Sequence, residues 1–78
     1  MDKLTAYQKE VVKTLSNFHH RVWVEPTTLA TTMQKQAKTL EKKLLELSAS
    51  NLVEEHLTAN GSKGFRLSKT GRDTARTL

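Results

Sequence analysis

Three consecutive stretches decide the fold: PTTLATTM at 26–33, QKQ at 34–36 and AKTLEKKLLELSAS at 37–50. Proline suits the first turn of a helix, because its missing N–H has no partner to lose there. An apolar face runs from Leu29 to Met33, and the polar 34–36 segment interrupts it. Leu40, Leu44 and Leu47 then start a second face at helical spacing. We predict a helix of about eight residues, a tight turn, and a longer helix over 36–50.

The segment before Pro26 predicts one more helix and a short extended stretch. An apolar stripe with helical spacing runs from Leu4 to Phe18, and predicts a helix over 5–18. Thr5 and Gln8 have the spacing of a capping box at its start. Val22-Trp23-Val24 is β-branched and aromatic, which is typical of a short strand or an extended connector.

The segment after residue 50 predicts a hairpin and a last helix. Asn51 tolerates the left-handed conformation that ends helices. Apolar and polar residues alternate over 52–58 and again over 65–67, around an Asn60-Gly61 turn signal, so we expect a β-hairpin with its tip at 59–64. Ser68 is a candidate N-cap for a final helix over 69–77, and Gly71 weakens that helix.

The order helix, short strand, short helix, turn, longer helix, hairpin, helix predicts one α+β domain over 1–78. The fold class is a winged helix-turn-helix: a three-helix core, a small antiparallel sheet of two or three strands forming one wing, and a short C-terminal helix. The expected core residues are Leu4, Val11, Leu15, Leu29, Leu40, Leu44, Leu47, Leu52 and Leu67.

Local motifs add a family resemblance. Leu4-Thr5-x-x-Gln8-x-x-Val11-Val12-x-x-Leu15 resembles the first helix of the winged domain in MarR-like transcriptional regulators. Leu29-Ala30, Leu40, Leu44-x-x-Leu47 and Asn51-Leu52-Val53 are similar to their helix-turn-helix, with Asn51 where the family usually has glycine. Leu67-Ser68-x-x-Gly71-Arg72 resembles their exit from the wing.

The resemblance implies a transcriptional regulator that binds double-stranded DNA. Full-length MarR-like proteins also carry helices at both ends that build a dimer. Only about ten residues follow the wing here, so we expect a minimal module. A single small module buries little surface on DNA, which favours a homodimer, at least on DNA.

Composition limits the other classes of function. The 78 residues include no cysteine and carry a net charge of +5, which favours an anionic partner. Two windows, 26–40 and 56–72, contain no acidic residue. The longest apolar run is three residues, so we expect no membrane segment and a cytoplasmic protein. We find no nucleophile motif, phosphate-binding loop or metal-ligand spacing, and expect no enzyme activity, no metal and no cofactor.

The candidate DNA-binding residues lie off the predicted apolar stripes, near the start of the 36–50 helix and on the wing. Such a helix fits the major groove, where glutamine pairs with adenine and lysine with guanine, and the wing fits the backbone or minor groove. The candidates are Thr27, Thr28, Gln34, Lys35, Gln36, Lys38, Thr39, Lys42, Lys43, Ser62, Lys63 and Arg66.

Other interpretations stay open at this point. A lysine-rich helix face is often only a solvated surface, and Glu41 and Glu46 are spaced to pair with those lysines. Winged helices also serve as protein-interaction adaptors that do not touch DNA. A duplex-RNA or replication-associated module has the same sequence features. A continuous positive face over Lys35, Lys38, Lys63 and Arg66 favours DNA, and a large exposed apolar patch elsewhere favours a protein partner.

Overall fold

A computed structural model describes residues 4–19, 21–59 and 61–78. It contains four helices and one hairpin in the predicted order. The elements are α1 (Ala6–Ser16), α2 (Pro26–Met33), α3 (Ala37–Ala49), β1 (Val53–Leu57), β2 (Lys63–Leu67) and α4 (Lys69–Ala75). No helix within the described ranges is long and apolar enough to span a bilayer.

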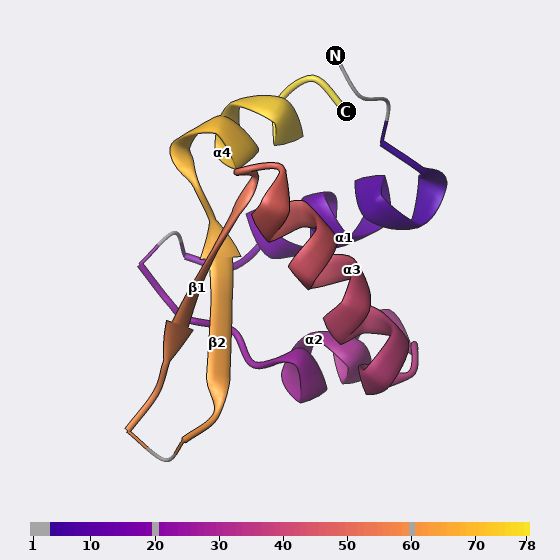
Figure 1. The fold of residues 1–78 in the computed structure, drawn as a ribbon. Helices are drawn as coiled ribbons and strands as arrows, with labels where there is room; N and C mark the ends of the chain where they lie inside the picture. Colours follow the sequence, from indigo (N-terminus) through magenta and orange to yellow (C-terminus); the bar gives the residue numbers. More distant parts are fainter. Residues whose placement is uncertain (1–3, 20, 60) are drawn as a thin grey trace.

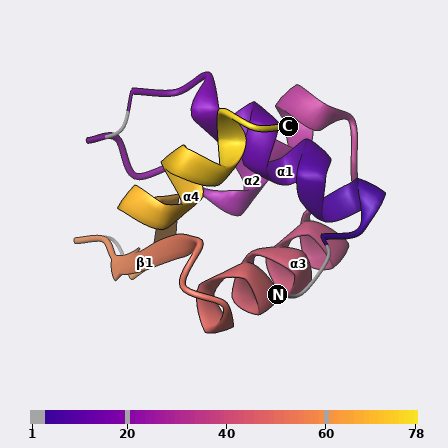
Figure 2. The same cartoon turned by 90° about the horizontal axis from the view of Figure 1, so that it is seen from above.

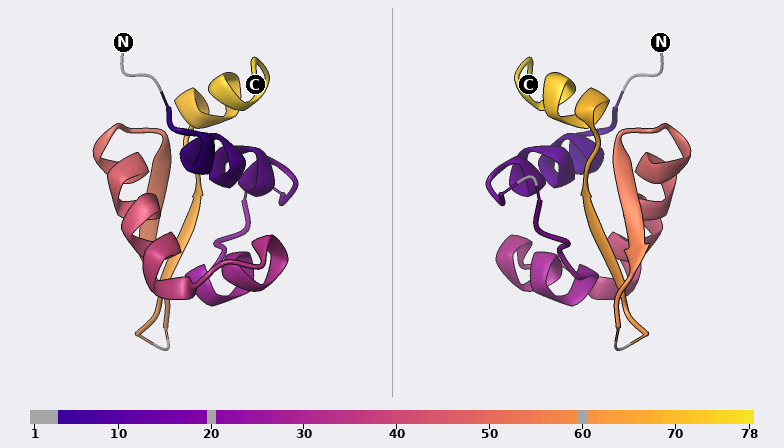
Figure 3. Two further views of the ribbon diagram at one scale, coloured as in Figure 1. Left: turned by 90° about the vertical axis from the view of Figure 1, so that its right-hand side faces the viewer. Right: turned by 90° about the vertical axis from the view of Figure 1, so that its left-hand side faces the viewer.

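The elements divide the molecule into two ends (Figure 1). Both chain termini lie at one end, beside α4 and the start of α1. At the other end lie α2, the start of α3 and the β1–β2 connection, and the hairpin extends beyond the helices there (Figure 3). We call this second end the wing end. Seen from above, α3 occupies one side of the molecule, and α1 and α4 lie beside it (Figure 2).

Helix boundaries follow from local chemistry. The capping box at α1 is present: Thr5 Oγ1 accepts from the Gln8 amide at 3.1 Å, and Gln8 Oε1 accepts from the Thr5 amide at 2.9 Å. Helix α2 begins at Pro26 and ends where Gln34 turns left-handed with φ 57°. Asn51 is left-handed after α3, with φ 63°, as its residue type predicts. Gln36 and Ser50 cap α3, so the predicted 36–50 helix is confirmed to within its caps.

The sheet is a two-stranded antiparallel hairpin, in which Val53 pairs with Leu67 and Leu57 with Lys63. The 22–24 segment joins it through one bridge, because Val24 and Phe65 exchange both backbone hydrogen bonds at 2.8 Å. The connector prediction is therefore confirmed, with a single bridge in place of a full third strand. The predicted tip at 59–64 is wrong at one end, because Lys63 and Gly64 already belong to β2.

The core lies between α1, α2, α3 and the inner face of the hairpin. Seven of the nine predicted core residues are buried there; Leu4 and Leu52 are only half-buried at its edge. Phe65 is fully buried and was not predicted, because a single aromatic in a short hairpin strand carries no periodic signal. The other unpredicted core residues are Val12, Val24, Ala30, Met33 and Val53.

A close contact joins α4 to the turn after α3. Ser68 accepts from the Gly71 amide at 3.0 Å and donates to the Asn51 carbonyl at 2.6 Å. The Ser68 amide also donates to the Leu52 carbonyl at 3.0 Å. A Cβ on Gly71 would collide with that same Leu52 carbonyl oxygen. Gly71 therefore allows α4 to approach the backbone after α3, although glycine weakens the helix itself.

Gly71→Ala tests this contact by the sign of its effect. Alanine is the better helix former by about 1 kcal/mol, so helix propensity alone predicts a more stable protein. We expect the opposite, a loss of about 1–3 kcal/mol in the free energy of unfolding, because the Leu52 backbone has to move. Urea unfolding measures this difference. Thr70→Ala, at an exposed neighbouring position, is the control and should change stability by no more than about 0.5 kcal/mol.

Candidate nucleic-acid interface

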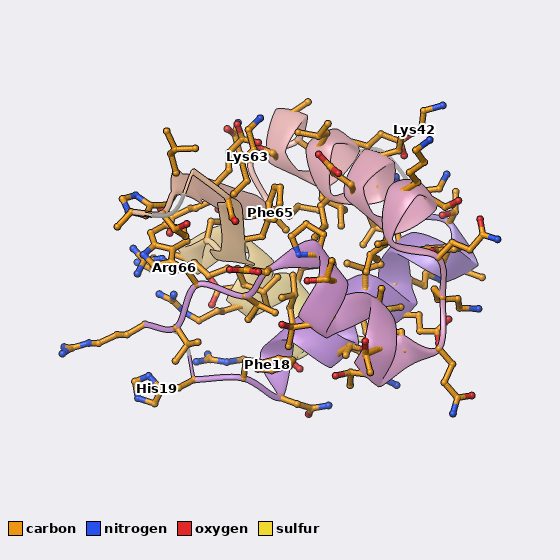
Figure 4. All side chains as sticks on the ribbon, turned by 90° about the horizontal axis from the view of Figure 1, so that it is seen from below. Phe18, His19, Lys42, Lys63, Phe65 and Arg66 are labelled. Atoms are coloured by element: carbon orange, nitrogen blue, oxygen red, sulfur yellow. The ribbon has the colours of Figure 1, made fainter. Side chains whose placement is uncertain are left out.

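The wing end presents α3 and the hairpin on one surface. Viewed toward this end, Lys42 on α3 and Lys63 on β2 lie along the same side of the molecule (Figure 4). Phe65 points inward from β2, while Phe18 and His19 lie on the side opposite α3. The two segments that lack acidic residues, 26–40 and 56–72, thus both contribute to the wing end.

The outward face of α3 carries the strongest candidates. Its inward face is buried through Leu40, Leu44 and Leu47, so the helix exposes Lys38, Thr39 and Lys42. These three side chains line a shallow surface hollow together with Glu41 and Leu45. Lys38 and Lys42 make no ion pair with any described residue, so both ammonium groups remain available to a ligand.

Lys35, in the turn before α3, and Lys43, on α3, both lie beside α1. The Lys35 ammonium is 3.9 Å from a Glu10 carboxylate oxygen and 5.4 Å from the centre of the Tyr7 ring. The Lys43 ammonium is 3.7 Å from a Glu46 carboxylate oxygen and 5.8 Å from the same ring. The structure does not bring these two lysines together with Lys38 and Lys42, and nearby carboxylates offset their charge.

Arg66 lies on the outer face of the hairpin, away from Phe65. Its Nε donates to Glu54 at 3.0 Å, and its guanidinium lies 4.0 Å from the Trp23 ring centre. Trp23 also stacks on His56, with ring centres 4.8 Å apart. Trp23 also lies close against Gly64, where an added Cβ would lie 2.7 Å from the Trp23 Cβ. This cluster holds the 22–24 segment against the outer face of the wing.

The β1–β2 connection positions the wing lysine. The Thr58 amide donates to the Ser62 carbonyl at 2.7 Å, and the Gly61 amide to the Thr58 carbonyl at 3.0 Å. Gly61 has φ 81°, a left-handed conformation that glycine adopts without strain. Ser62 is half-buried in this connection, whereas Lys63 is exposed and makes no ion pair with a described residue.

The remaining candidates lie on α2 and in the turn after it. Thr27 and Thr28 are exposed in the first turn of α2, and their carbonyls accept from the hydroxyls of Thr31 and Thr32. Gln34 and Gln36 are exposed on either side of Lys35. These uncharged side chains lie at the wing end, where their polar groups are open to solvent.

The predicted continuous positive face is only partly present. Lys38 and Lys63 lie on the α3 side, but Lys35 faces α1 and Arg66 faces Trp23. The exposed large apolar side chains among the described residues come from four separate segments: Val22, Leu45, Leu57 and Leu78.

Two residues of the hollow on α3, Leu45 and Glu41, were not among the candidates predicted from the sequence. The helical spacing in the sequence could have predicted both, since both lie on the helix face that carries Lys38 and Lys42.

Comparison with known proteins identifies the fold. No protein-family model and no curated protein sequence matches the chain. Among solved structures, MepR, a transcription regulator of the Staphylococcus aureus multidrug efflux pump MepA, superposes with a TM-score of 0.84 at 19% identity, over 96% of this chain and 55% of MepR. A MepR–DNA complex gives 0.85 at 18% identity, over 96% and 55% of the two chains. Mutant MarR from E. coli gives 0.83 at 18%, over 96% and 54%.

The fold is therefore the MarR-like winged helix-turn-helix that the sequence predicts. The chain spans about half the length of these solved proteins.

Proposed function

We propose that this protein is a transcriptional regulator that binds double-stranded DNA in a sequence-specific manner. In this proposal α3 enters the major groove, and the β1–β2 wing contacts the backbone or the minor groove. The observation that carries it is the exposed face of α3, where Lys38 and Lys42 make no ion pair with a described residue, on the side that also carries Lys63.

The dimensions support this arrangement. The major groove of B-DNA is about 12 Å wide and accepts one α-helix. In helix-turn-helix proteins the start of the second helix reaches base edges while neighbouring polar groups contact phosphates. In this proposal the exposed Thr27 and Thr28 contact phosphates, and the exposed Gln36 and Lys38 contact bases. The similarly folded MepR has been solved as a DNA complex, which adds support from fold analogy.

Two copies on one site complete the proposal. A single module of this size buries about 600–1,000 Å² on DNA, which favours weak binding by a monomer. Two copies bound about one helical turn apart, on a palindromic site, double the contact area. Sedimentation of the free protein and of its complex measures the number of copies.

Selection of bound duplexes from a random pool tests binding and specificity together. Enrichment of one motif, with two half-sites about 10 base pairs apart, is the expected result. If no duplex is retained at low salt, the protein-interaction adaptor becomes the better assignment. Uniform retention of all duplexes would contradict specificity while leaving DNA binding in place.

Single lysine substitutions separate the roles of helix and wing. On the selected site, Lys38→Ala should cost about 1–3 kcal/mol of binding free energy and relax the preference at one base pair. Lys63→Ala should weaken all duplexes about equally, because a wing lysine contacts phosphates or the minor groove. Fluorescence anisotropy on the selected duplex and on single-base variants measures both effects.

Lys13→Ala is the matched control, since Lys13 is an exposed lysine on α1, outside the helix-turn-helix and the wing. Its affinity should equal that of the parent protein. Equal losses from all three substitutions would show that only diffuse charge attracts DNA, and would contradict the specific interface.

A further inference from the structure

Leu45 is an exposed leucine in the second half of α3, one turn after Lys42. Its neighbour Leu44 is fully buried, whereas Leu45 retains 39% of its surface in contact with solvent. No packing role within the described domain accounts for this side chain, because the buried core uses Leu40, Leu44 and Leu47. An exposed leucine lowers the solubility of a protein. The residues around Leu45 therefore indicate which function its exposure supports.

Those surroundings are polar and of mixed charge. Lys38, Lys42 and Leu45 follow the i, i+4, i+7 spacing of one helix stripe, so they lie on the same face. Thr39 and Glu41 complete the hollow that this stripe lines. The Glu41 carboxylate repels phosphate, and the Leu45 side chain has no group that can donate a hydrogen bond to phosphate. The hollow therefore suits the edges of bases better than the DNA backbone.

We propose that Leu45 is a specificity-determining residue that contacts the C5-methyl group of a thymine. The inference rests on the proposed insertion of α3 into the major groove. The thymine methyl is the apolar group of the standard base edges in that groove, and apolar side chains recognise it by contact. Leu45 is the large apolar side chain that the exposed stripe of α3 presents.

A protein partner for Leu45 fits the structure less well. Protein interfaces use contiguous apolar patches of several hundred Å². The other exposed large apolar side chains among the described residues are Val22, Leu57 and Leu78, which come from segments outside α3. Leu45 instead follows Lys38 and Lys42 on one stripe of α3, and these two lysines, which make no ion pair with a described residue, attract a polyanion.

Replacement of thymine by deoxyuridine tests the contact, because it removes the methyl group and leaves base pairing intact. In the duplex obtained by selection, each thymine is replaced in turn and the dissociation constant is measured. We expect one position per half-site to weaken binding about fourfold, the equivalent of one buried methyl group. In Leu45→Ala the same replacement should change the dissociation constant by less than about 1.5-fold, since the methyl has lost its partner.

Leu57→Ala is the matched control. It removes the same atoms from a leucine that is 64% exposed on the wing, outside the major-groove helix. The deoxyuridine effect should persist in Leu57→Ala at its full size. Circular dichroism checks that both variants stay folded, which is expected for exposed positions.

The outcomes separate the two proposals. If the parent protein retains no duplex, the proposed function fails. If it selects a motif but no thymine responds to deoxyuridine, or if Leu45→Ala keeps the full response, DNA binding stands and the Leu45 inference is overturned. Loss of the response in Leu57→Ala as well as Leu45→Ala would also overturn it, because the effect would then be indirect.

Discussion

Leu44→Ala should destabilise the protein by about 2–5 kcal/mol, as truncation of buried leucines does in other cores. Leu44 is fully buried in α3 and belongs to the cluster that joins α3 to α1 and the hairpin. Small domains have modest total stability, because they bury a smaller fraction of their surface. Chemical denaturation followed by circular dichroism measures the loss, and at 37 °C we expect a large unfolded fraction.

Leu45→Ala controls this experiment with the same atoms removed one residue further along. Leu45 is exposed, so its truncation should change the free energy of unfolding by no more than about 0.5 kcal/mol. Comparison of the two variants shows which face of α3 is buried, because adjacent helix residues point about 100° apart. If Leu45→Ala were the more damaging change, a different face of α3 would be buried and the interface would be misassigned.

The sequence predicted the helices well because their signals are local. The capping box of Thr5 and Gln8, the proline at the start of α2 and the left-handed Asn51 all act within four residues. The leucine stripe of α3 repeats at helical spacing, so its buried face could be identified without knowing what it packs against.

The contacts that the sequence did not predict join distant segments. Phe65 became the largest fully buried side chain because the 22–24 segment pairs with β2, a contact made across about forty residues of chain. Gly71 weakens a short helix when considered alone, and only the approach of Leu52 shows why no side chain fits there. Neither contact leaves a periodic pattern.

The candidate site shows the same limit. Lys38, Thr39 and Lys42 could be predicted as site residues because they lie off the leucine stripe of α3. The structure groups these three side chains around one hollow. Lys35 and Arg66 share a residue type with them, but Glu10 and Glu54 stand close enough to offset their charge. Those pairings connect α1 to the turn after α2, and β1 to β2, so residue counts alone overstate the free positive charge.

The salt dependence of binding should therefore be set by three lysines per copy, Lys38, Lys42 and Lys63, which have no carboxylate partner among the described residues. Each lysine charge that displaces a counterion from the DNA contributes about −0.9 to the slope of log affinity against log salt concentration. One copy predicts a slope near −3, and two copies on one site predict a slope near −5. If all the candidate lysines and the candidate arginine contributed, paired and unpaired, the slope for one copy would be about −5.

The measured slope must then agree with the number of protein copies bound to each DNA site. Between 50 and 200 mM salt, two bound copies should lose affinity by about 10³-fold and one copy by about 40-fold. Titrations at four salt concentrations, with sedimentation of the same complexes, measure both quantities. Lys63→Ala should make the slope shallower by about one for each copy bound, while Lys13→Ala should leave it unchanged. A one-to-one complex that holds DNA with nanomolar affinity and a slope near zero would contradict this account, because it would need contacts other than these lysines.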